Sequence, residues 1–163
     1  MDQIKDTVIL DAFDKLDKLD ENQYEAFFDN LGNQQPILFG YLMEFAESLE
    51  REEASEDMVF LLAIIYISYT DMKGGEVPHI TEEILDAAEE KIISQLQELE
   101  SIEDEDAQFA FIEKHQTQPD LMEYCNDILG GDEEYPSSFS EEEMGLAYTN
   151  LKVIIEAFEI ATA

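Results

Sequence analysis

The stretch Met58-Val-Phe-Leu-Leu-Ala-Ile-Ile-Tyr-Ile-Ser-Tyr69 decides the fold, because Ser68 is its one polar residue in a chain crowded with carboxylates. It is too short to cross a membrane, which takes about 20 apolar residues. A segment that is apolar on every side has to be packed on every side. Ser55 is a suitable N-cap, Gly74-Gly75 are suitable stop residues, and the stretch does not alternate. We therefore predict a buried helix over Ser55–Met72 rather than a buried strand.

Composition limits the kinds of partner that the chain can have. The 163 residues are 45% hydrophobic, which is enough for a real core despite the charge. Asp and Glu number 41 against 8 Lys and Arg, giving a formal net charge of −33. Such a surface repels phosphates and anionic lipids, so we expect no direct binding to nucleic acid and no binding to a membrane. A saline habitat is the alternative explanation of the acidity.

Cysteine usage and the first residues indicate the compartment. Cys125 is the single cysteine, so no disulfide can form within the chain. The start Met-Asp-Gln-Ile-Lys-Asp lacks the basic and apolar regions of a signal peptide. We expect a cytoplasmic protein.

Apolar residues spaced by three and four predict helices through the rest of the chain. Asp20, Thr81 and Ser140 are predicted N-caps, and Ser140 opens a full capping box with Glu143. Pro36 and Pro119 suit the first position of a helix, and Gly32 is predicted to end the second helix. The count is about eight helices without a convincing strand, which places the chain in the all-α class.

Two short stretches of the first half recur in the second half. Ile9-Leu10-Asp11-Ala12 returns as Ile84-Leu85-Asp86-Ala87, 75 residues later. Gln35–Tyr41 returns as Gln118–Tyr124, 83 residues later, with four of seven residues identical. The order and spacing favour a tandem duplication over chance similarity between amphipathic helices.

The duplication predicts two four-helix units that pack around one shared core. Residues 1–73 form the first unit, 74–80 a linker and 81–163 the second unit. In this alignment Met58 falls on Met144, and the buried helix has a more polar copy over Ser140–Phe158. We expect the first of these two helices to be enclosed and the second to be half-exposed.

Sequence patterns for catalysis are nearly absent. The chain has no phosphate-binding glycine loop, no catalytic serine motif and no zinc-ligand spacing, so we predict no cofactor and no metal. Cys125 and His115 are the best candidates for an active site, although Cys125 lies on an apolar helix face that favours packing. A small helical enzyme or ligand-binding domain around Cys125 and His115 is the first alternative function. A homo-oligomeric structural protein, such as a homodimer, is the second.

The acidity itself gives the preferred functional hypothesis. Acids at helical spacing stand about 5–6 Å apart and can present regular negative charge to a protein that binds phosphates. We therefore expect a non-enzymatic protein that binds a basic partner protein, as nucleic-acid mimics and immunity or inhibitor proteins do. The densest runs are Glu98–Asp106 and Asp132–Glu143. The candidate partner-binding acids are Glu98, Glu100, Glu103, Asp104, Glu105, Asp106, Asp132, Glu133, Glu134, Glu141, Glu142 and Glu143.

Overall fold

The computed structural model describes residues 2–163 and confirms the all-α prediction. Within that range eight helices and no strand are formed. The helices are α1 (Asp6–Asp17), α2 (Glu21–Gln34), α3 (Pro36–Ala46), α4 (Glu52–Met72), α5 (Glu82–Glu100), α6 (Glu105–Lys114), α7 (Pro119–Gly130) and α8 (Glu141–Thr162). None of the helices in residues 2–163 is both long and apolar enough to span a bilayer.

Most of the predicted helix starts are confirmed by side-chain hydrogen bonds. The Asp20 carboxylate accepts a hydrogen bond from Gln23 N at 2.8 Å, and the Thr81 hydroxyl accepts one from Ile84 N at 3.2 Å. Ser140 and Glu143 form the predicted capping box at the start of α8. Pro36 and Pro119 occupy the first positions of α3 and α7, where the missing N–H costs nothing.

Two helix ends differ from the prediction. Ser55 is not an N-cap, because α4 already begins at Glu52 and Ser55 lies inside its first turns. The Ser55 hydroxyl instead donates to Ala46 O at 2.6 Å, a carbonyl at the end of α3 that also accepts from Leu49 N at 3.2 Å. Gly32 does not end α2, which continues to Gln34 and passes directly into α3.

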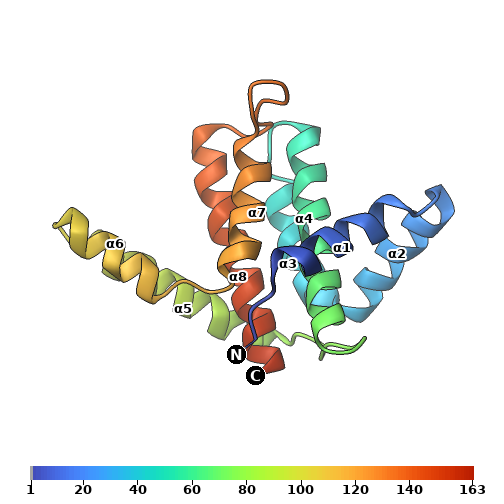
Figure 1. Cartoon of the computed structure of the whole chain (residues 1–163), viewed down its shortest axis with the longest axis horizontal. Helices are drawn as coiled ribbons and strands as arrows, with labels where there is room; N and C mark the ends of the chain where they lie inside the picture. Colours follow the sequence, from blue (N-terminus) through green and yellow to red (C-terminus); the bar gives the residue numbers. More distant parts are fainter. Residues whose placement is uncertain (1) are drawn as a thin grey trace.

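The helices are arranged as a central group with two arms. Helices α4, α7 and α8 run through the middle of the molecule, while α1–α2 and α5–α6 extend to opposite sides (Figure 1). Helices α1 and α3 pack on α4, and α5 and α7 pack on α8 in the same manner. Contacts between the halves are also reciprocal. Helix α3 of the first half contacts α8, helix α7 of the second half contacts α4, and α4 and α8 contact each other.

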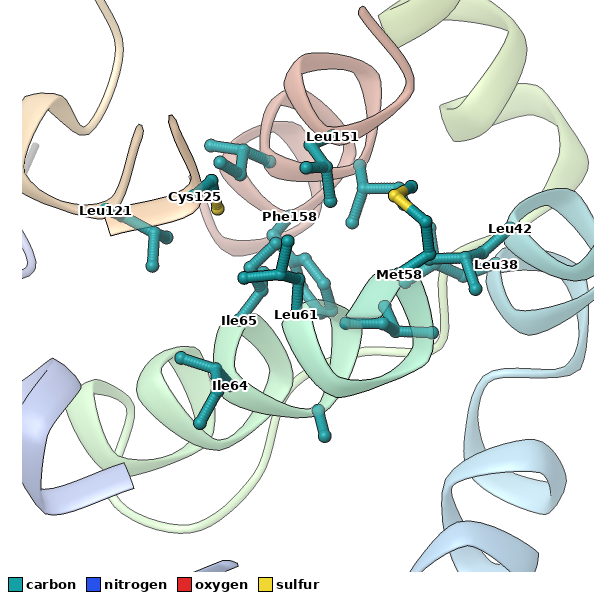
Figure 2. Close-up of a cluster of buried hydrophobic side chains, with 14 of the residues drawn as sticks. Leu38, Leu42, Met58, Leu61, Ile64, Ile65, Leu121, Cys125, Leu151 and Phe158 are labelled. Atoms are coloured by element: carbon teal, nitrogen blue, oxygen red, sulfur yellow. The ribbon is translucent and has the colours of Figure 1, made fainter. Parts of the chain in front are cut away.

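One hydrophobic core is shared by both halves. Figure 2 shows Leu42, Met58, Cys125, Leu151 and Phe158 converging from α3, α4, α7 and α8. The ring of Tyr69 on α4 stacks on Phe158 of α8, with centroids 4.8 Å apart. The second long helix is half-exposed, as predicted, but unevenly: its first turns keep exposed residues such as Gly145 and Leu146, whereas every residue from Val153 to Glu159 is buried and α5 packs against the helix.

Gln35, at the junction of α2 and α3, joins the first half to the linker. Its side chain is 1% exposed. Its Nε2 donates to Pro78 O at 2.9 Å, and its Oε1 accepts from Ile80 N at 2.8 Å. One amide therefore holds the extended segment that leads into α5.

Gln118, which precedes α7, does the same for the segment that leads into α1. Its Oε1 accepts from Ile4 N at 2.7 Å, and its Nε2 donates to Asp2 O at 3.0 Å. Each half thus binds the backbone in front of the other half's first helix through a buried glutamine.

Burial follows the same pattern in corresponding helices. Three buried positions of α1 and three of α5 lie 76 residues apart: Ile9, Ala12 and Leu16 against Leu85, Ala88 and Ile92. Three of α3 and three of α7 lie 83 residues apart: Leu38, Leu42 and Ala46 against Leu121, Cys125 and Leu129. The starts of α4 and α8 lie 89 residues apart. These correspondences support the duplication, which stays a prediction. For α1 and α5 the offset between buried positions is 76 residues, whereas the matching sequence stretches lie 75 residues apart.

Candidate functional site

The first acidic run, Glu98–Asp106, forms the tip of the α5–α6 arm. Glu98 and Glu100 end α5, and Glu103 lies in the connection. Asp104 is the N-cap of α6, where its carboxylate accepts from Ala107 N at 3.0 Å. Glu105 and Asp106 follow in the first turn of α6. All six carboxylates are exposed, at the end of the molecule farthest from α1 and α2 (Figure 1).

The second run, Asp132–Glu143, belongs to the loop between α7 and α8 and to the first turn of α8. Asp132 orders this loop by accepting from Tyr135 N at 2.6 Å. Glu133 and Glu134 are exposed, as are Glu141 and Glu142. Figure 1 places this loop at the end of the central helices, away from the tip of the α5–α6 arm, so the two runs do not form one surface.

The carboxylate of Glu143 is hydrogen-bonded to the backbone and has a structural role. It accepts from Ser140 N and from Glu50 N, each at 3.0 Å. These backbone hydrogen bonds lower the pKa of Glu143 below its usual value. The carboxylate thereby ties α8 to the segment between α3 and α4.

The candidate acids are not neutralised by the protein's own cations. Within residues 2–163 three ion pairs form: Lys15 with Asp71, Arg51 with Glu53, and Lys91 with Glu156. None of these pairs includes a residue of either acidic run. The carboxylates of the arm tip are therefore exposed and have no ion-pair partner within residues 2–163.

Exposed apolar side chains accompany the acidic tip on the α5–α6 arm. Helix α6 contains no buried residue, and it packs chiefly on α5. Phe109 is 63% exposed and Ile112 is 46% exposed, on one face of α6 because they lie three residues apart. The sequence did not single out these residues, because a short amphipathic helix looks the same whether a core covers its apolar face or not.

The structure does not assemble an active site around Cys125 and His115. Cys125 is fully buried, and burial raises the pKa of its thiol to about 12, so the reactive thiolate is absent at neutral pH. His115 follows α6, with its ring 4.3 Å from that of Phe111, and no hydrogen bond joins it to Cys125 in residues 2–163. His79 faces Gln34 O at 3.3 Å. Among the described residues no three His, Cys, Asp or Glu side chains are grouped to hold a metal ion.

Comparison with known proteins gives no relative from which to transfer a function. No family model, no curated protein and no solved structure matches the chain. A function can therefore be inferred only from the residues and their geometry.

Proposed function

We propose that the chain is a non-enzymatic interaction protein that binds a basic partner protein through the acidic tip of its α5–α6 arm. The observation that supports this most strongly is the absence, within residues 2–163, of any ion pair to the carboxylates of Glu98–Asp106. A chain with 41 acidic residues and 8 basic ones has few cations of its own to offer. A cationic partner would neutralise the tip and relieve its self-repulsion.

The shape of the arm favours this role. A helical hairpin that packs on the body mainly through α5 can enter a groove of a partner without disturbing the core. Phe109 and Ile112 supply an apolar centre beside the acidic tip, and interfaces commonly combine an apolar centre with a charged rim. The apolar contacts would hold the complex, while the carboxylates would set its specificity and speed of association.

A partner whose own surface binds phosphates fits this arrangement best. Glu103, Asp104, Glu105 and Asp106 present four consecutive carboxylates on a turn and a helix start, a local density of charge that resembles a phosphate backbone. A nucleic-acid-binding protein or a nuclease presents the matching basic surface. The acidic arm would then occupy that surface and exclude nucleic acid, as a mimic or an inhibitor does.

Affinity capture with matched variants tests the proposal. The arm variant carries Glu98→Gln, Glu100→Gln, Glu103→Gln and Asp106→Asn, and keeps the Asp104 cap. The control variant neutralises four exposed acids on the opposite arm, with Asp11→Asn, Asp14→Asn, Glu21→Gln and Glu25→Gln. Both variants lose the same amount of charge.

Lysate of the source cell is passed over each immobilised protein at low salt, and bound proteins are released at about 1 M salt, where the Debye length is about 3 Å. We expect one basic protein on the wild type and on the control variant, and its loss from the arm variant. Equal recovery on all three baits, or recovery of no basic protein, would contradict the proposal.

A further inference from the structure

A hollow of about 450 Å³ lies where the two ends of the described chain meet. Asp2 and Ile4 line it from the N-terminal segment, and Tyr69, Met72 and Lys73 line it from the end of α4. Glu159 lines it from α8. Figure 1 shows the N- and C-termini side by side at this end of the molecule, away from both acidic runs.

Glu159 is a buried carboxylate that has no cationic partner among residues 2–163. It is 4% exposed, its Oε1 accepts a hydrogen bond from Gln118 Nε2 at 2.6 Å, and the Tyr69 hydroxyl also hydrogen-bonds to its side chain. No lysine, arginine or histidine of residues 2–163 lies within ion-pair distance of it. Buried carboxylates are rare unless they are paired, and the other buried carboxylate of α8, Glu156, does have a lysine, Lys91, at 2.5 Å. The Glu159 carboxylate therefore lines the hollow without an ion-pair partner among residues 2–163.

The walls of the hollow suit the body of an organic cation. Ile4 is buried and Met72 half-buried, which gives the hollow apolar sides. The Tyr69 ring is fixed by its stacking on Phe158. Burial and the nearby Glu159 carboxylate raise the pKa of Tyr69, so its hydroxyl stays protonated and neutral.

Lys73 also lines the hollow, but it forms no ion pair with Glu159. Its Nζ donates to Thr162 O at 3.2 Å, which ties the end of α4 to the end of α8. The first half has no carboxylate at the position that corresponds to Glu159. The starts of α4 and α8 lie 89 residues apart, and the residue 89 positions before Glu159 is Thr70. Thr70 donates to Tyr66 O within its own helix at 2.7 Å. The buried carboxylate is thus particular to the second half.

We propose that this hollow binds a small primary amine, with the ammonium group on Glu159 and the alkyl chain against Ile4 and Met72. Anionic ligands are disfavoured by Glu159 and Asp2. The net charge of −33 raises the local concentration of cations around the protein. Saturable binding at one buried carboxylate is distinct from loose association of amines with the acidic surface.

Titration with n-butylammonium chloride, followed by NMR of the Ile and Met methyl groups, tests the site. Sodium chloride is adjusted to hold the ionic strength constant, and 1-butanol is the neutral probe of similar size. We expect saturable shifts of the Ile4 and Met72 methyls with the amine and none with the alcohol. We also expect intermolecular NOEs from the butyl chain to both methyls in the wild-type protein.

Glu159→Gln removes the charge and keeps an oxygen that can accept from Gln118, and it should weaken amine binding at least tenfold. Glu25→Gln, at an exposed position on α2, should leave binding unchanged. Equal binding of 1-butanol, the absence of wild-type NOEs to Ile4 and Met72, or shifts spread over the acidic surface would overturn the proposal. The wild-type NOEs decide the question if Glu159→Gln does not fold.

Discussion

Replacing Gln35 by methionine removes the amide that joins the two halves and leaves the volume of the side chain nearly unchanged. Two hydrogen bonds are lost, one to Pro78 O and one from Ile80 N. Ile80 N–H is buried, and leaving such a group without an acceptor costs about 1–3 kcal/mol. Pro78 is exposed, so water can replace the amide at its carbonyl and the loss there is about 1 kcal/mol. The sum is about 3 kcal/mol.

Equilibrium unfolding in urea, followed by far-UV circular dichroism, measures this change. For a chain of this size about 3 kcal/mol corresponds to a decrease in Tm of about 6–12 °C. The matched control is Gln34→Met, one residue earlier and exposed, which should stay within about 0.5 kcal/mol of the wild type. Hydrogen exchange should also show faster exchange of the Ile80 amide in Gln35→Met. If Gln35→Met is as stable as Gln34→Met, or if the Ile80 amide keeps its protection, the reasoning is refuted.

Three further predictions concern charge and protonation. Lys91→Met strands the buried Glu156 carboxylate and should cost about 2 kcal/mol by urea unfolding, whereas Lys15→Met at the exposed pair with Asp71 should cost at most about 1 kcal/mol. Sodium chloride should raise the Tm of the wild type, because it screens repulsion among unpaired carboxylates. A Tm that does not change with salt would show that the carboxylates are already neutralised within the protein. The unfolding free energy should fall as pH rises above 9, because Cys125, with a folded pKa of about 12 against 9.0 ordinarily, keeps its proton in the folded state and loses it in the unfolded chain. Cys125→Ala should reduce that pH slope, and an unchanged slope would show that this thiol does not contribute.

The fold class and most helix boundaries could be predicted because local rules determine them. Proline at Pro36 and Pro119, and the caps at Asp20, Thr81 and Ser140, act within one turn of the helix. The start of α4 was misplaced because Ser55 uses its hydroxyl on a carbonyl of the preceding helix, and a partner from another element has no local signature. The burial of Glu156 on α8 could not be predicted for a related reason. Glu156 is a polar residue whose lysine lies on α5, far away in sequence.

Of the candidate sites, the sequence could predict only the features that follow from composition and local charge density. Charge density identified the acidic runs, but only the fold shows that they lie on separate parts of the molecule and that Glu143 is a helix cap with an additional tie to Glu50. The exposure of Phe109 and the position of Glu159 depend on which helices cover which faces. The spacing of apolar and polar residues along α6 and α8 is the same whether or not another helix covers these side chains, so no pattern in the sequence could have identified them.

The central claim is that the acidic tip of the α5–α6 arm steers a basic partner onto the molecule. Its most direct test is the association rate constant of the captured partner, measured by stopped flow across a range of salt concentrations. For the wild type and for the α1–α2 control variant, we predict a rate that falls steeply with salt. The variant with Glu98, Glu100, Glu103 and Asp106 neutralised should associate at least about tenfold more slowly at low salt, with a shallower salt dependence. Identical rates and salt slopes for the two variants would contradict the account.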